Sequence, residues 1–210
     1  MAISTRDLEA LPDVAPLKRL LQAMAMLDAI LQPDWQYRYY SFNAHWPKGQ
    51  MMGSMRNCQG DEFFALFNNH GVFLKGFVHE SPMARIPSEH FYRDLPREFD
   101  ECRREAAFFP EDVTFCLWRL IGQPAWSYGK VDFPLYEDVD GSAYILSMLD
   151  GAPGTYRSWA GEYYERDVPI RAIETIYRHQ PLTEELVFAL NPQQSLEKLG
   201  SDIAEIGYPG

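Results

Sequence analysis

The residue types best suited to acid–base chemistry gather in one stretch of the chain, residues 45–84. Within it, two short segments, Asp61-Glu62 and His79-Glu80, carry three carboxylates and an imidazole, and Arg56 and Asn57 precede them. Carboxylate and imidazole groups serve as general acids and bases, and borderline metals take both as ligands. The sequence therefore singles out one candidate binding cluster, formed by Arg56, Asn57, Asp61, Glu62, His79 and Glu80.

Three strand-like runs must position this cluster. Residues 51–57, 62–68 and 72–78 have strand length, and Gln59-Gly60 and His70-Gly71 separate them. Each separator suits a two-residue hairpin turn, so the runs are predicted to form an antiparallel meander. Apolar side chains fall on both faces of the second and third runs. These strands are therefore expected in the centre of a sheet that is covered on both sides.

Two-residue turns would also fix the register of the strands. With these turns, Asn57 lies opposite Glu62, and Glu62 lies opposite His79. This register predicts a Glu62–His79 pair at one end of the sheet and places His45 at the other end, roughly 20 Å away. A carboxylate opposite an imidazole would raise the pKa of the ring and fix its tautomer.

The remaining chain predicts an α+β fold in a single domain, residues 1–210. An N-terminal helix is expected over about 14–31, where apolar residues recur at three- and four-residue spacing after the capping residue Asp13. A central, mostly antiparallel sheet follows, with the meander at about 51–78 and further strands at about 36–42, 114–120, 126–133 and 143–149. Residues 97–107 are predicted to form a charged helix that faces solvent. The C-terminal third is predicted to be helical, ending at Gly207 in a left-handed cap.

The composition limits the classes of partner. A net charge of −11 and a pI near 4.9 argue against binding to nucleic acids or anionic membranes, which depends on Lys and Arg, and favour a basic protein partner. The three cysteines form no CxxC pair, which is typical of reduced thiols. No signal-like or membrane-spanning apolar run occurs, so we expect a cytoplasmic protein.

Several longer strings carry a resemblance to other proteins. They are residues 52–57 (MGSMRN), 60–62 (GDE), 75–83 (KGFVHESPM), 114–119 (TFCLWR) and 206–209 (IGYP). These strings resemble a family of uncharacterised bacterial proteins over most of the chain. The resemblance implies a bacterial, intracellular, single-domain protein. Because that family has no assigned activity, the resemblance implies no functional residue.

The candidate cluster can have a chemical role or a purely structural one. The chain has no HExxH, no paired cysteines and no GxSxG motif, so neither a metal site nor a nucleophilic triad is predicted, and no cofactor is expected. These absences favour a network of hydrogen bonds and ion pairs that holds the end of the sheet, with Arg56 as a cation.

Two functional classes follow from the sequence. The first is a non-catalytic acidic binding protein that captures a basic partner, in the manner of bacterial immunity proteins. The alternative is a small hydrolase or metal-dependent enzyme that uses Asp61, Glu62, His79 and Glu80. The alternative requires these four side chains to converge in a concave, partly exposed pocket.

Overall fold

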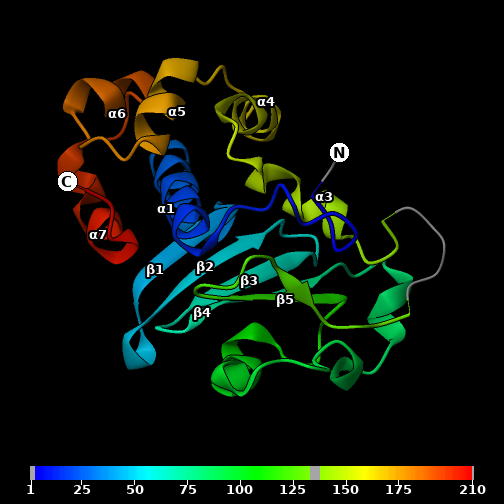
Figure 1. The fold of residues 1–210 in the computed structure, drawn as a ribbon. Helices are drawn as coiled ribbons and strands as arrows, with labels where there is room; N and C mark the ends of the chain where they lie inside the picture. Colours follow the sequence, from blue (N-terminus) through cyan, green and yellow to red (C-terminus); the bar gives the residue numbers. More distant parts are fainter. Residues whose placement is uncertain (1–2, 133–137, 210) are drawn as a thin grey trace.

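A six-stranded antiparallel sheet forms the middle of the protein (Figure 1). The computed structural model describes residues 3–132 and 138–209. The strands lie side by side in chain order and are β1 (Tyr40–Trp46), β2 (Gln50–Arg56), β3 (Glu62–Phe67), β4 (Gly71–Phe77), β5 (Phe115–Leu120) and β6 (Ser127–Tyr128). The predicted meander is confirmed, and β3 and β4 occupy central positions in the sheet.

Helices lie before, within and after the sheet sequence. They are α1 (Val14–Leu31), α2 (Asp100–Arg103), α3 (Ser142–Leu146), α4 (Pro153–Tyr163), α5 (Ile170–Tyr177), α6 (Glu184–Leu190) and α7 (Leu196–Ile206). The predicted α+β fold, with an N-terminal helix and a helical C-terminal third, is confirmed. Asp13 caps α1 by accepting a hydrogen bond from the Val14 N–H at 2.7 Å, and Gly207 ends α7 at φ 67°. None of the described helices combines the length and apolar character needed to cross a bilayer.

Separate layers cover the two faces of the sheet (Figure 1). Helix α1 and the C-terminal helices pack on one face, where the side chains of Met55 and Phe63 point. The segment between β4 and β5, which consists of short helical turns and α2, packs on the other face against Phe64 and Phe73. Because side chains alternate along a strand, each central strand contributes to both clusters, as the apolar residues on both of its faces predicted.

A buried carboxylate in α1 joins this helix to the first strand of the sheet and to α4. Asp28 in α1 is fully buried and accepts hydrogen bonds from the backbone N–H groups of Tyr39 (3.1 Å) and Tyr40 (2.7 Å) at the start of β1. It also accepts a hydrogen bond from the hydroxyl of Tyr156 in α4. Burial raises the pKa of Asp28 to about 6, although the hydrogen bonds from Tyr156 and the backbone oppose the shift.

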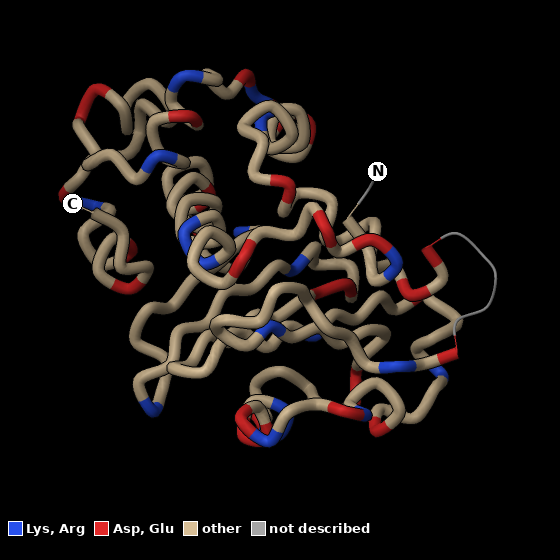
Figure 2. The backbone as a smooth tube through the Cα atoms, in the orientation of Figure 1, with Lys and Arg blue, Asp and Glu red and all other residues tan. Residues whose placement is uncertain are grey.

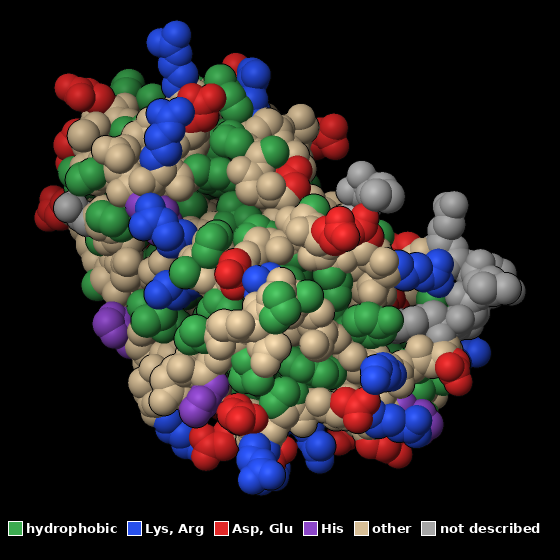
Figure 3. Space-filling model, in the orientation of Figure 1, with side chains coloured by type: hydrophobic (Ala, Val, Ile, Leu, Met, Phe, Trp, Pro, Cys, Tyr) green, Lys and Arg blue, Asp and Glu red, His purple; other side chains and the backbone are tan. Residues whose placement is uncertain are grey.

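Charged residues are spread along the whole backbone. Figure 2 shows acidic and basic positions interspersed over the sheet and both layers, with several acidic positions near α3 and the N-terminal segment. On the face of Figure 3, acidic side chains lie among basic ones along the lower rim. The excess of acidic residues is therefore spread over the elements rather than gathered on one of them.

Two of the predicted elements are wrong. The predicted strand at about 143–149 is helical, because the carboxylate of Asp138 accepts hydrogen bonds from the N–H groups of Ala143 (2.6 Å) and Tyr144 (2.9 Å) and so starts α3. The predicted helix at 97–107 is broken into 3-10 turns flanking the short α2. Its apolar side chains Phe99 and Cys102 are buried against the sheet rather than exposed.

Two predicted strands are displaced or shortened. The strand predicted at about 36–42 begins at Tyr40, because Trp35–Tyr37 form a 3-10 turn capped by Asp34. The strand predicted at about 126–133 pairs over Ser127–Tyr128, after which one more hydrogen bond, from the Gly129 N–H to the Cys116 carbonyl, ends the ladder. Residue 133 of that prediction lies outside the described residues.

Candidate functional site

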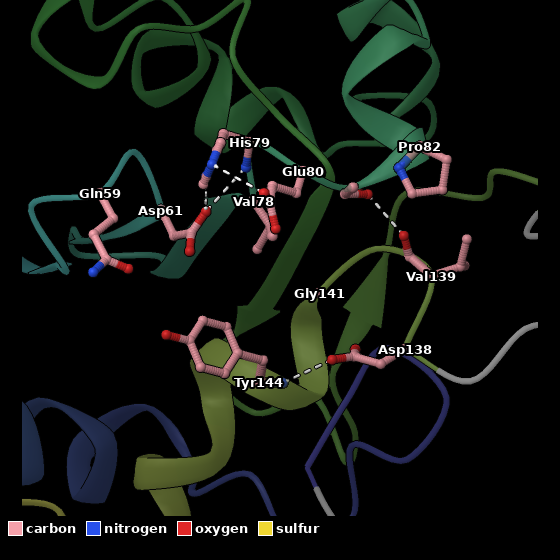
Figure 4. Close-up of a pocket in the computed structure, with 11 residues that line it drawn as sticks. Gln59, Asp61, Val78, His79, Glu80, Pro82, Asp138, Val139, Gly141 and Tyr144 are labelled. Atoms are coloured by element: carbon pink, nitrogen blue, oxygen red, sulfur yellow. Dashed lines mark hydrogen bonds and ion pairs between the residues drawn. The ribbon is translucent and has the colours of Figure 1, made fainter.

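A cleft opens at the end of the sheet where β3 begins and β4 ends. Its volume is about 800 Å³, and Figure 4 shows the residues that line it. The β2–β3 turn, the segment after β4 and the start of α3 contribute the walls. The residues that line it are Gln59, Asp61, Val78, His79, Glu80, Ser81, Pro82, Asp138, Val139, Gly141 and Tyr144.

Asp61 and His79 form a hydrogen-bonded dyad in this cleft. One oxygen of Asp61, Oδ1, accepts hydrogen bonds from the ring Nδ1 of His79 at 2.7 Å and from its backbone N–H at 3.0 Å. The side chain of Asp61 is 9% exposed and that of His79 is 44% exposed. Because an ionised carboxylate only accepts hydrogen bonds, the contact places a proton on Nδ1. Nε2 is then the ring nitrogen that has no hydrogen-bond partner among the described residues.

Asn57 holds the carboxylate of Asp61 in place. Its side-chain Nδ2 donates to the second oxygen of Asp61 at 2.7 Å, so both carboxylate oxygens are occupied. Its Oδ1 accepts from the backbone N–H groups of Gln59 (2.8 Å) and Asp61 (3.0 Å). This local pattern closes the turn between β2 and β3, as Asn side chains do when they bond the backbone a few residues on.

Gly60 allows the turn to lie against the imidazole. Its φ of +108° is a backbone conformation that other residues rarely adopt, and a Cβ there would lie 3.3 Å from the His79 ring. The residue before the turn's centre, Cys58, also has positive φ, at 59°. The sequence Asn-Cys-Gln-Gly-Asp thus folds as a five-residue connection that presents Asp61 to His79.

The predicted register of the meander is wrong. Glu62 pairs with Arg56 on β2 and with Phe77 on β4, so neither predicted partner, Asn57 nor His79, lies opposite it. The β2–β3 connection is longer than the predicted two-residue turn. The carboxylate that meets His79 is consequently Asp61.

The second turn is displaced by one residue along the chain. Asn68 pairs with Gly71 through the Asn68 N–H and the Gly71 carbonyl, which leaves Asn69 and His70 as the two central residues. The side-chain oxygen of Asn68 accepts from the N–H groups of His70 (2.8 Å) and Gly71 (3.0 Å) and stabilises this position. A one-residue shift of a turn moves the facing partner by two residues, which explains why Phe77 stands where His79 was expected.

The structure divides the six predicted residues between two places. Asp61, His79 and Glu80 line the cleft, and Asn57 supports Asp61 from behind. Arg56 and Glu62 line a different cavity, on the face of the sheet opposite α1. The enzyme hypothesis requires four side chains to converge in one pocket. Three of them do so, and Glu62 lies elsewhere.

Glu80 is the exposed member of the cleft cluster. Its side chain is 86% exposed, and its Oε1 lies 4.0 Å from Nε2 of His79. No hydrogen bond holds it among the described residues. Its carboxylate is consequently available to a molecule that enters the cleft.

Asp138 and Tyr144 were missed by the sequence analysis, which placed a strand over part of this segment. Asp138 caps α3 and so positions Tyr144, whose ring is 53% exposed at the wall of the cleft. Gly141 brings the segment close to β4, since a Cβ there would lie 2.3 Å from Val78. The Asp140-Gly141-Ser142 sequence is a helix-start signal that could have identified this arrangement.

Metal binding has no three-ligand cluster to support it in the described part of the chain. Across residues 3–132 and 138–209, His, Cys, Asp and Glu side chains form no group of three or more that could hold a metal ion. In the cleft, Asp61 is hydrogen-bonded to Nδ1 of His79, and Glu80 lies 4.0 Å from Nε2 of the same ring. The arrangement can bind a cationic group through its carboxylates, or accept a proton at Nε2.

Comparison of the chain with protein-family models, with curated proteins and with solved structures finds no match.

Proposed function

We propose that the protein is a non-catalytic acidic binding protein that captures a basic protein partner through the cleft, as bacterial immunity proteins capture their targets. The observation that carries this proposal is the charge of the cleft wall. Its lining includes three acidic residues, Asp61, Glu80 and Asp138, and no Lys or Arg among the described lining residues. A concave surface with charges of one sign concentrates the potential and attracts ligands of the opposite sign.

An arginine of the partner matches the exposed groups of the cleft. Glu80 offers a carboxylate that is 86% exposed, with Oε1 4.0 Å from Nε2 of His79. A guanidinium binds carboxylates with two parallel hydrogen bonds. Tyr144 offers an exposed aromatic ring beside it, and a guanidinium also stacks on such rings. By contrast, the oxygens of Asp61 and Asp138 are already engaged, so these residues contribute negative potential rather than a direct contact.

The decisive variant is Glu80→Gln, which removes the charge and keeps the shape of the side chain. The protein is used to retain binding partners from a lysate of the organism that encodes it, at low and at high salt. We expect basic proteins to be retained at low salt and released at high salt, and Glu80→Gln to weaken the measured affinity of a retained partner about tenfold, as loss of a close charge pair does.

Glu185→Gln on α6 is the matched control, because Glu185 is an exposed glutamate on the far side of the molecule from α3 (Figure 1). It changes the net charge equally and is expected to leave the affinity unchanged. Retention that is insensitive to salt, or an equal loss for both variants, would contradict a cleft that recognises a basic partner.

A second candidate function rests on the dyad itself. With Nδ1 held by Asp61, Nε2 of His79 is oriented as a general base. It would take a proton from a water molecule as the water oxygen attacks an ester carbon, and would return the proton to the departing alkoxide. Asp61 would stabilise the imidazolium that forms between these steps.

Hydrolysis of a panel of activated esters tests this alternative. If His79 is the base, His79→Ala lowers the rate by roughly 10² to 10⁴, whereas Glu185→Gln on α6 leaves it unchanged. Equal rates for wild type and His79→Ala would eliminate the hydrolase. Metal analysis of the same preparations separates the metal-dependent version, which predicts stoichiometric metal that disappears in His79→Ala.

A further inference from the structure

A second cavity, about 250 Å³ in volume, lies under β1, β2 and β3 on the face of the sheet opposite α1. We call it the aromatic groove. It contains Arg56 and Glu62, the two members of the predicted cluster that the cleft leaves out. Five aromatic residues contribute rings to its walls, Trp35, Trp46, Phe64, Phe108 and Phe109, whereas the ring of Phe42 packs in the cluster on the α1 face.

Three rings form a stack along this groove. Phe64 and Phe108 stack with ring centroids 4.7 Å apart, and Trp46 stacks on Phe108 at 5.7 Å. Trp35 and Phe109, which are 51% and 57% exposed, stand at the rim. The Phe64 and Phe108 rings are buried within the stack, so the exposed rings of Trp35 and Phe109 are the ones on which a planar ligand can stack.

Polar groups without partners lie among these rings. The guanidinium of Arg56 is 4.5 Å from the centre of the Trp35 ring and makes no ion pair with any described carboxylate. Glu62 lies directly opposite Arg56 on β3. Trp46 Nε1 and Ser41 Oγ are buried and have no hydrogen-bond partner among the described residues. Both atoms lie behind the surface of the groove, so they mark a part of its wall whose hydrogen bonds are unsatisfied.

A buried lysine holds the rim of the groove in position. Lys75 is buried in β4, and its Nζ donates hydrogen bonds to the backbone carbonyls of Phe109 (2.9 Å) and Asp112. Phe109 itself adopts a left-handed backbone conformation, with φ 46°, which is unfavourable for a bulky residue. Backbone strain of this kind is maintained where the surroundings enforce it, and it recurs at ligand clamps.

The charges of the groove select for a neutral ligand. Arg56 opposes a cation, while Glu62 and Glu205, both in the lining, oppose an anion. A ligand that satisfies Arg56 and Glu62 together must present hydrogen-bond acceptors beside hydrogen-bond donors on one planar ring. Guanine has this pattern: its O6 and N7 accept from arginine, and its N1–H and N2 amine can donate to a carboxylate.

We infer that the aromatic groove binds a guanine base, presented as a free base or nucleoside. The ring stacks on the exposed rings of Trp35 and Phe109, Arg56 reads the acceptor edge, and Glu62 reads the donor edge. The small volume fits one base, and the net charge of −11 disfavours a polyanionic nucleic acid as the source. This site is independent of the cleft and of the function proposed for it.

Titration with guanosine, adenosine and indole tests the inference. We expect saturable binding of guanosine, with adenosine and indole at least about tenfold weaker, because adenosine offers Arg56 and Glu62 the wrong pattern and indole has no acceptor edge. Arg56→Gln and Phe109→Ala are each expected to weaken guanosine binding about tenfold or more. Phe188→Ala, which removes a phenylalanine of similar exposure on α6, is the matched control.

Amide and indole NMR signals give a readout that does not depend on affinity alone. Trp46→Phe identifies the signal of the Trp46 indole N–H, which we expect to shift on addition of guanosine in the wild-type protein. The same spectra show whether Arg56→Gln retains the fold. Absence of saturable guanosine binding, equal binding of indole, or unchanged binding in both Arg56→Gln and Phe109→Ala would overturn the inference.

Discussion

At the scale of single residues, Asn57 connects the local turn to the chemistry of the cleft. It accepts two backbone hydrogen bonds within the turn and donates one to the carboxylate of Asp61. Its role explains why the carboxylate stays at hydrogen-bonding distance from His79 in both candidate functions. Through these contacts Asn57, one of the predicted binding residues, positions the carboxylate of Asp61.

Asn57→Ala should therefore destabilise the protein as well as loosen the dyad. It leaves one oxygen of a buried carboxylate and two backbone N–H groups without their partner, and we expect a loss of about 2 kcal/mol in the free energy of unfolding. Urea denaturation measures the loss. Asn69→Ala is the control, since Asn69 is an exposed turn asparagine without a side-chain hydrogen bond among the described residues. Equal stability of the two variants would contradict this role.

A part of the site can be predicted when the general pattern of strands and turns places it, and not when single turn side chains decide it. Asp61, His79 and Glu80 were identified as a cluster because two adjacent hairpins necessarily bring their ends together. The pairing within the cluster was not predictable, since it depends on the side chains of Asn57 and Asn68, which select longer or displaced turns. A displacement of one residue was enough to exchange Glu62 for Asp61 as the partner of His79.

At the scale of elements, α1 was the most predictable part of the fold. Its cap at Asp13 and its apolar spacing are local signals, and both of its ends were predicted at the residues where they occur. The segment before β5 was predicted poorly, because its charged residues suggested an exposed helix while Phe99 and Phe108 are buried against the sheet. The strand predicted over α3 failed for a similar reason, since the cap of α3 comes from Asp138, outside the apolar run.

The link from α1 to β1 and α4 through Asp28 makes stability depend on pH. Its folded pKa of about 6 lies above the ordinary value of 3.8, so the folded state binds the proton more tightly than the unfolded state. This contribution to stability is fully present below pH 3.8 and is lost as the pH rises through about 6. A shift of roughly two units corresponds to about 3 kcal/mol.

Asp28→Asn isolates this effect, because it keeps the shape of the side chain and removes the titration. We expect the difference in unfolding free energy, wild type minus variant, to fall by about 3 kcal/mol between pH 4 and pH 7 and then to level off. Denaturation at a series of pH values measures it. A difference that stays constant over this range would show that Asp28 does not titrate within the folded protein.

At the scale of the whole molecule, the net charge of −11 disfavours folding and favours the binding of a basic partner. Acidic residues outnumber basic ones by 30 to 19, so the folded chain repels itself more strongly than the expanded unfolded chain does. Added salt screens charges that are more than about 10 Å apart at 0.1 M. Screening therefore relieves the repulsion within the protein and also weakens the attraction between the cleft and a basic partner.

The midpoint of urea unfolding is accordingly expected to rise between about 10 mM and about 150 mM sodium chloride, over the same range in which a basic partner is released. Measuring the urea midpoint and the retained partner at each salt concentration separates screening from destabilisation. If salt destabilised the protein, the midpoint would fall as the partner is released. Glu80→Gln is expected to weaken binding, whereas Glu185→Gln, which removes one negative charge outside the cleft, is expected to leave it unchanged. A midpoint that falls with salt would contradict self-repulsion as the dominant long-range term.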